Sequence, residues 1–240
     1  MAEKNFVIFG QGRSGSDLLR SLLNSHPLVY CDIERFNPKT YQTEKPLSRF
    51  LMKTFPLWYI QNAMKKHPDK IYGFKLFFWH VTDAGILITK LYNKGWKIIH
   101  ISRRNVLKQA FSAEIGKLTK QYHRTNDTPL TAETYHINPE RIAAGISRRV
   151  SMMQKEIELV SKIEHLQVFY EEDLQDEKKW NKTTGNLFKY LGIEPFEVKS
   201  YLLITDPRPD TERIENFDEI IEYLNKNGFD EIVENYFHWL

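Results

Sequence analysis

The chain of 240 residues contains a single cysteine, Cys31, and this scarcity excludes two kinds of architecture. One thiol can build neither a disulfide framework nor a metal site made of several thiolates. So few cysteines are typical of a reducing compartment, and we therefore expect a cytoplasmic location. Stability has to come from a hydrophobic core, for which the length and the 41% hydrophobic content suffice.

Long apolar runs are also missing. No run approaches the about 18 residues of a transmembrane helix, and residues 1–5 lack the apolar segment of a signal peptide. The sequence has no internal repeat, no low-complexity tract and no linker rich in Pro, Gly and Ser. These absences predict one domain over residues 1–240, without a membrane span.

Acidic residues are scarce in the first half of the chain, although the net charge of +3 is small. Residues 1–120 carry 20 Lys and Arg against 8 Asp and Glu, whereas residues 121–240 carry 14 against 23. The excess of positive charge in the first half indicates an anionic partner. The basic residues do not form one run interleaved with aromatic residues, so we expect no nucleic acid among the partners.

Short apolar segments of β type alternate with longer segments of helical period, which predicts an α/β fold. We expect strands at 5–9, 28–31, 71–78, 97–102 and 166–170. Helices are expected at 16–25, 46–66 with a break at Pro56, 82–93, 106–120, 140–164, 180–191 and 215–225. The pattern favours a central, mostly parallel sheet flanked by helices.

The most informative stretch is FVIFGQGRSGSDLLRSLL, residues 6–23. A strand, a glycine-rich turn and a helix follow one another, which gathers backbone amides and a helix N-terminus at one place. Such an arrangement binds phosphate. Arg13 adds a fixed positive charge beside the anion.

The glycine spacing leaves two nucleotide-binding alternatives open. Gly10, Gly12 and Gly15 satisfy the G-x-G-x-x-G pattern of a Rossmann fold. Asp32 lies about where a ribose-binding acid is found, so an NAD(P)-dependent oxidoreductase fits the spacing. The loop also resembles a P-loop, but it lacks the lysine of that motif after the last glycine, which disfavours hydrolysis of ATP or GTP.

Four ordered stretches carry a resemblance to one family. GRSGSDLLRSLLNSHP, residues 12–27, resembles the 5′-phosphosulfate-binding loop of sulfotransferases that use 3′-phosphoadenosine 5′-phosphosulfate (PAPS). The likeness is to the bacterial branch of nodulation and trehalose sulfotransferases, related to carbohydrate sulfotransferases. YGFKLFF, ISRRNVLKQAFS and the C-terminal third from VFYEEDLQD to PRPDTERIENFDEI are similar to that branch in the same order. The resemblance leaves residues 39–69 and 121–147 unmatched and implies a P-loop-like α/β domain.

The resemblance implies PAPS as donor, adenosine 3′,5′-bisphosphate (PAP) as product, and a small-molecule or glycan hydroxyl of carbohydrate or glycolipid type as acceptor. It assigns the 5′-phosphosulfate to a loop of six residues: Gly12, Arg13, Ser14, Gly15, Ser16 and Asp17. It assigns the 3′-phosphate to Arg104 and Ser112, and it places Arg208 in an arm that folds over the donor. Asp17 departs from the family, which usually has a hydroxyl residue there, and a carboxylate beside phosphate is repulsive.

Sulfuryl transfer needs a base, in-line placement and stabilisation of the leaving phosphate oxygen. We expect Arg13 to stabilise that oxygen, without a metal ion. Glu34, just beyond the second strand, is the predicted base, in agreement with the family's glutamate, and nearby arginines should lower its pKa. His80 is the alternative base, as in steroid and phenol sulfotransferases. The acidic run 171–173 is interpreted as a solvated helix start.

Overall fold

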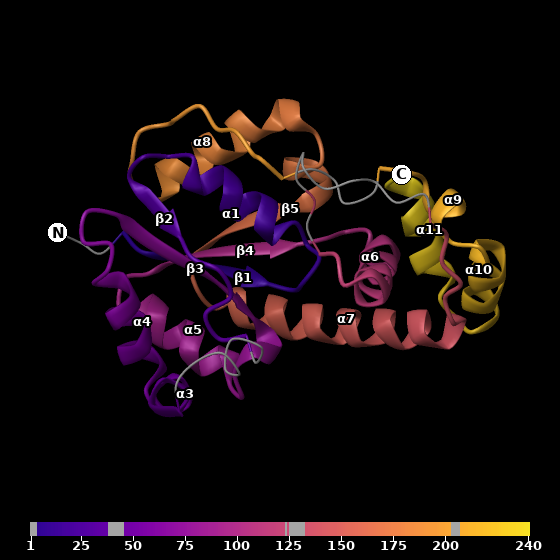
Figure 1. Cartoon of the computed structure of the whole chain (residues 1–240), viewed down its shortest axis with the longest axis horizontal. Helices are drawn as coiled ribbons and strands as arrows, with labels where there is room; N and C mark the ends of the chain where they lie inside the picture. Colours follow the sequence, from indigo (N-terminus) through magenta and orange to yellow (C-terminus); the bar gives the residue numbers. More distant parts are fainter. Residues whose placement is uncertain (1–3, 38–45, 123, 125–132, 203–206) are drawn as a thin grey trace. The chain divides into compact units, whose positions relative to one another are not determined.

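The computed structural model describes residues 4–37, 46–122, 124, 133–202 and 207–240 (Figure 1). The chain divides into two compact units. The first unit combines residues 1–102 with 155–199, and the second combines residues 103–154 with 200–240. The single domain expected over residues 1–240 stays a prediction.

A five-stranded parallel sheet forms the centre of the first unit. Its strands are β1 (Phe6–Gly10), β2 (Val29–Cys31), β3 (Ile71–Phe77), β4 (Lys97–Ser102) and β5 (His165–Phe169). They lie in the order β2-β3-β1-β4-β5, and every pairing between them is parallel. The predicted α/β class with a central parallel sheet is therefore confirmed.

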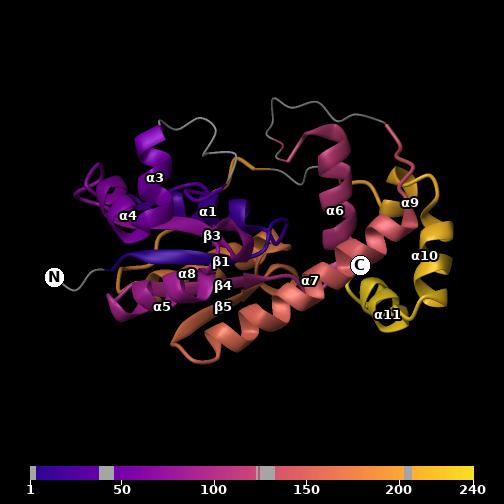
Figure 2. The same cartoon turned by 90° about the horizontal axis from the view of Figure 1, so that it is seen from below.

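Helices cover both faces of this sheet, which explains the unbroken apolar run of β1. Phe6 and Ile8 pack against α1 (Ser16–Asn24) and α8 (Trp180–Tyr190). Val7 and Phe9 point the other way, into the core formed with α4 (Pro56–Met64) and α5 (Ala84–Asn93). The two layers are separate in Figure 1, and Figure 2 views this unit from the side of α5.

Two strands end in features that depend on particular residues. A Cβ added to Gly10 would lie 2.1 Å from the carbonyl oxygen of Ile101, so the neighbouring strand admits only glycine at the end of β1. The short edge strand β2 is held by the last residue of α1. Asn24 donates to the Cys31 carbonyl at 2.9 Å and accepts from its amide at 2.6 Å, and the Cys31 thiol is buried.

The second unit is helical and has its own core. It contains α6 (Val106–Thr119), the first part of α7 (Pro139–Val160), α9 (Asp210–Arg213), α10 (Phe217–Lys226) and α11 (Asp230–His238). Phe111, Phe217 and Tyr236 meet at ring-centroid distances of 5.9 to 6.0 Å at the centre of this core. The sequence predicted one helix after the C-terminal arm, and it missed α9 and α11.

Two segments differ from their predicted form or refine it. The helix expected at 46–66 is divided into α3 (Pro46–Thr54) and α4, because Pro56 occupies the first position of the second helix. The acidic run lies in the first turn of a helix, as expected, but that turn is π-helical and Glu171 is buried in it, so the run is not a solvated cluster. Asp173 accepts a hydrogen bond from the Phe169 amide at 2.8 Å and thereby closes that turn.

Candidate functional site

A hydrogen bond between two of its own residues closes the loop between β1 and α1. Ser14 is fully buried, and its hydroxyl donates to the Gln11 carbonyl at 2.7 Å. Arg13 and Gly15 have the left-handed φ values of 66° and 86°. A side chain at Gly15 would also place its Cβ 2.4 Å from the Tyr170 ring. The hydroxyl of Ser14 thus holds the loop itself.

The loop leads directly into the N-terminus of α1, where backbone amides suit an anion. The first helical bond of α1 runs from the Leu19 amide to the Gly15 carbonyl at 3.0 Å, so the amides before it point out of the helix end. These amides and the helix dipole favour a negative group. Arg13 is half-buried beside them.

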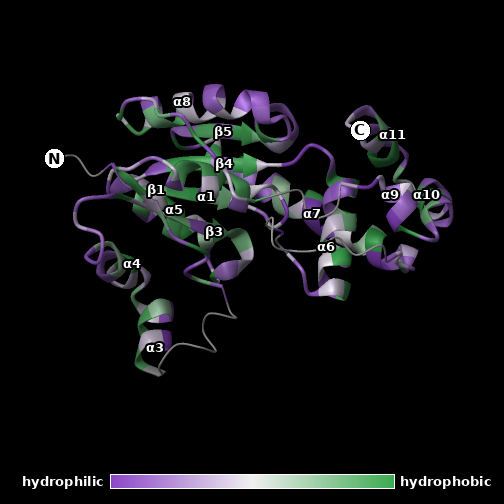
Figure 3. Ribbon diagram, turned by 45° about the horizontal axis from the view of Figure 1, so that its top comes forward, coloured by the Kyte–Doolittle hydropathy of each residue, from purple (hydrophilic) through white to green (hydrophobic). Residues whose placement is uncertain are grey.

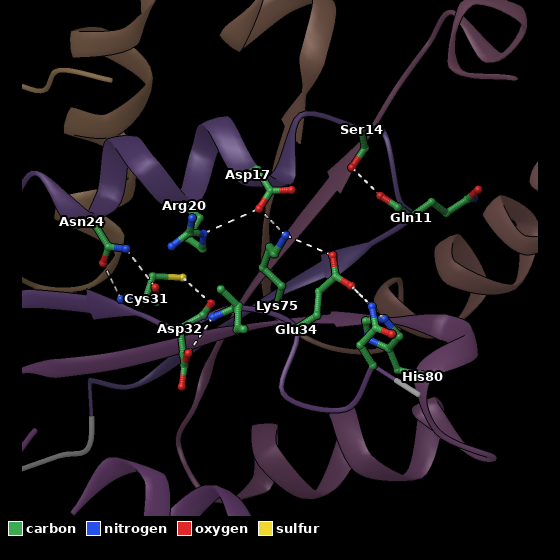
Figure 4. A network of polar contacts seen from close by, with 12 residues as sticks. Gln11, Ser14, Asp17, Arg20, Asn24, Cys31, Asp32, Glu34, Lys75 and His80 are labelled. Carbon is green, nitrogen blue, oxygen red and sulfur yellow. Dashed lines mark hydrogen bonds and ion pairs between the residues drawn. The ribbon is translucent and has the colours of Figure 1, made fainter. Parts of the chain in front are cut away.

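Lys75 of β3 links this loop to the predicted base (Figure 4). Its side chain is only 2% exposed, and its Nζ lies 2.5 Å from Asp17 Oδ1 and 3.1 Å from Glu34 Oε1. A lysine is almost never buried without such partners. Sequence reasoning did not select Lys75 as a site residue, although one cation inside the apolar strand IYGFKLFF was the available signal.

Asp17 therefore faces cations rather than standing alone at the helix end. Besides Lys75, Arg20 Nε lies 3.6 Å from the same carboxylate oxygen. The residue before the helix, Gly15, provides no side-chain cap. The repulsion expected from a carboxylate in a phosphate loop is thus offset by two neighbouring positive groups.

Glu34 lies beyond the end of β2 with both carboxylate oxygens in contact with polar groups. Oε1 meets Lys75, and Oε2 accepts a hydrogen bond from Asn37 and lies 3.4 Å from His80 Nε2. The ends of β1 and β2 are not adjacent, because β3 lies between these two strands. Lys75 on β3 contacts both Asp17, in the helix that follows the β1 loop, and Glu34, beyond β2.

The surroundings of Glu34 keep it ionised. Burial by itself raises the pKa of the carboxyl group, but the contacts with His80, Lys75 and Asn37 outweigh burial and lower the pKa to about 2. The predicted direction is thus confirmed, with a different cause from the arginines that we expected. Glu34 is a charged, weakly basic carboxylate at neutral pH.

His80 lies behind Glu34, away from solvent. Its side chain is 0% exposed, and its ring lies 4.8 Å from that of Phe77 and 4.5 Å from that of Trp79. The Phe77 amide donates to Nδ1 at 3.1 Å, which places the proton of the neutral ring on Nε2, toward Glu34. Burial lowers the pKa of His80, so this neutral form is favoured.

We expect acid to destabilise the protein through both groups. The folded-state pKa of Glu34, about 2, lies below its ordinary 4.5, so its contribution is complete above pH 4.5 and is lost as the pH falls toward 2. The pKa of His80 in the folded state is also lowered from 6.5, so the contribution of His80 to stability declines as the pH falls below 6.5. Below pH 4.5, Glu34→Gln should lose less stability than the wild type, by up to about 3 kcal/mol. Urea denaturation at successive pH values measures this, and parallel curves for the two proteins would contradict it.

Asp32 does not lie where a dinucleotide would need it. Its carboxylate accepts from the Tyr72 hydroxyl at 3.0 Å and from the Ile33 amide at 2.8 Å, and it lies 3.6 Å from Arg35 Nη1. In the Rossmann order the second strand neighbours the first, whereas here β3 intervenes. The glycine pattern therefore occurs here without the strand order that the Rossmann interpretation requires.

The remaining predicted donor residues belong to the second unit. Arg104 is exposed just before α6, and Ser112 is half-buried on that helix. Arg208 donates from Nη2 to the Glu133 carbonyl at 3.0 Å. Their roles toward a 3′-phosphate stay predictions that rest on the resemblance.

Among the described residues, no group of three or more His, Cys, Asp and Glu side chains is arranged to hold a metal ion. Within those residues, no helix combines the length and the apolar character that crossing a bilayer requires.

No family model and no curated protein matches this sequence, whereas solved structures do. A sulfotransferase from Alicyclobacillus acidocaldarius matches with a TM-score of 0.56 and 16% identity, covering 98% of this chain and 95% of its own. The chain shares the fold of this sulfotransferase. Mouse sulfotransferase SULT7A1 complexed with PAP matches with a TM-score of 0.49 and 15% identity, covering 97% of this chain and 84% of its own. The sulfotransferase domain from the curacin biosynthetic pathway has a TM-score of 0.46 and 18% identity, with 93% and 89% covered.

Proposed function

We propose that the protein is a sulfotransferase that moves a sulfuryl group from PAPS to a hydroxyl of a carbohydrate or glycolipid-type acceptor. The observation that carries the proposal is the Glu34 carboxylate, held by Lys75 and His80 at the edge of the sheet where β1 leads into the amide-rich loop. The sulfotransferase-like fold supports it.

The loop suits the phosphosulfate end of the donor. The amides of residues 14–16 and the Arg13 guanidinium supply hydrogen bonds and positive charge, and Lys75 compensates the Asp17 carboxylate that would otherwise repel the donor. We assign the 3′-phosphate to Arg104 and Ser112, and an arm over the donor to Arg208, on the resemblance alone.

Glu34 is the proposed base. It accepts the proton of the acceptor hydroxyl while the oxygen bonds to sulfur and the bond from sulfur to the 5′-phosphate oxygen breaks. A pKa of about 2 means that the proton moves late, after the hydroxyl has become strongly acidic through its new bond. His80 and Lys75 orient the carboxylate, and Arg13 with the loop amides stabilises the negative charge on the leaving oxygen.

Two exposed apolar side chains are sequence neighbours of Glu34 and of His80. Ile33 is 50% exposed next to Glu34, and Trp79 is 48% exposed next to His80. The Trp79 ring lies against His80, which in turn contacts Glu34, and an exposed indole suits the apolar face of a sugar ring. This juxtaposition supports an acceptor that has both a hydroxyl and a ring.

Nucleotide binding tests the donor assignment. We expect calorimetry to show PAP binding. Arg104→Ala should lower the affinity for PAP by about tenfold or more. The affinity for AMP, which lacks the 3′-phosphate, should not change. Arg141→Ala, at an exposed position of α7, is the matched control.

Three results would count against this assignment. A folded protein that binds no PAP would overturn the proposed function. Equal losses for PAP and AMP would remove Arg104 from the 3′-phosphate site. Binding of NADH in place of PAP, followed by fluorescence, would instead favour an oxidoreductase.

A further inference from the structure

Helices α3 and α4 present a continuous group of exposed apolar side chains, here called the α3–α4 patch: Leu47, Phe50, Phe55 and Trp58. Their exposed fractions run from 48% for Trp58 to 69% for Leu47. The opposite sides of the same helices enter the core through Met52, Tyr59, Ile60 and Ala63. Figure 3 shows hydrophobic residues along both helices. The side chains of the patch therefore remain outside the core that these helices help to form.

The spacing joins these four side chains into one surface. Leu47 and Phe50 are three residues apart, as are Phe55 and Trp58, and residues at this spacing lie on one side of a helix. The two pairs meet where the Phe50 and Phe55 rings approach to a centroid distance of 6.3 Å, edge to face. A contiguous exposed apolar surface of this kind marks an interaction site.

The charge around the patch indicates what it binds. Residues 47–66 contain no Asp or Glu, and their four basic residues, all exposed, are Arg49, Lys53, Lys65 and Lys66. Aromatic side chains with surrounding cations are typical of surfaces that lie in the headgroup region of anionic membranes. If a second copy covered the patch about a two-fold axis, these cations would face one another, which is repulsive.

We propose that the α3–α4 patch docks the protein on the surface of an anionic lipid bilayer. Phe50, Phe55 and Trp58 enter the boundary between headgroups and acyl chains, while the basic side chains meet lipid phosphates. The docking is peripheral and does not depend on the proposed sulfuryl transfer, so its test needs no donor or acceptor.

Vesicle sedimentation tests this proposal with the full chain. We expect binding to vesicles of phosphatidylcholine and phosphatidylglycerol in equimolar amounts, little binding to phosphatidylcholine alone, and weakening as salt rises to about 0.5 M. Phe50→Ser combined with Trp58→Ser should lower the apparent affinity at least about tenfold. The matched control is Ile86→Ser combined with Ile157→Ser, which removes two apolar side chains of similar exposure elsewhere in the first unit.

The proposal is overturned if the wild type does not sediment with the anionic vesicles, or if the patch variant and the control variant bind equally. Circular dichroism of both variants establishes that they fold. Light scattering without vesicles distinguishes a second copy as the occupant, because a dimer that only the patch variant loses would also overturn membrane docking. The salt dependence of the wild type is independent of any variant.

Discussion

The Glu34→Gln variant is expected to transfer sulfuryl groups about 100-fold or more slowly than the wild type. Its affinity for PAP should equal that of the wild type. Glutamine keeps the shape of the side chain but cannot accept the hydroxyl proton. The residues that hold the carboxylate, Lys75 and His80, remain in place. The measurement is PAP release from PAPS over a panel of sugars and glycolipids, with PAP binding followed by calorimetry.

Two further variants give this result its meaning. Glu177→Gln, at an exposed position outside the site, should keep the wild-type rate. His80→Gln should slow the reaction less than Glu34→Gln does, because His80 acts through the carboxylate. If Glu34→Gln retains the wild-type rate while His80→Gln is inactive, the histidine is the base and our assignment is wrong.

The Lys75→Met variant is expected to lose about 3 kcal/mol of its free energy of unfolding. Methionine fills the same space in β3 but leaves the carboxylates of Asp17 and Glu34 without the cation that they share. Donor affinity should fall as well, since Asp17 would then repel the phosphosulfate. Adding Asp17→Ser to this variant should restore part of both losses, because it removes one unpaired carboxylate.

Urea denaturation and PAP calorimetry measure these effects. Lys162→Met is the matched control, because Lys162, in the turn after α7, pairs with Glu158 at the protein surface, where an ion pair contributes about 0 to 1 kcal/mol. Equal stability changes at positions 75 and 162 would show that the buried lysine has no special role. A double variant no better than Lys75→Met would exclude Asp17 as its partner.

The fold was largely predictable because each strand is a short apolar run covered on both faces. Val7 and Ile8, for instance, enter opposite cores, so β1 shows no polar alternation and stands out from the helices around it. The break at Pro56 was predictable for a local reason too, since the missing amide and fixed φ of proline suit the start of a helix.

The site was predictable only where its chemistry is local. The loop of residues 10–16 is visible in sequence because strand, glycines and helix adjoin. The pairs Lys75–Asp17 and Lys75–Glu34 join residues far apart in the chain, and they depend on β3 lying between β1 and β2, an order that no local pattern specifies. The same reason hid Lys75 and His80 as neighbours that lower the pKa of Glu34, whereas Asn37 is only three residues away in the chain.

The lone cysteine has a practical consequence for the study of motion. Cys31 is 1% exposed at the end of the strand that leads to Glu34, and burial raises the pKa of its thiol, so alkylating reagents should not reach it in the closed protein. Because the sequence holds no second thiol, any labelling reports the exposure of Cys31 in β2, and labelling faster than global unfolding reports local opening there. The rate of that labelling thus measures local unfolding of the segment that precedes the proposed base, Glu34.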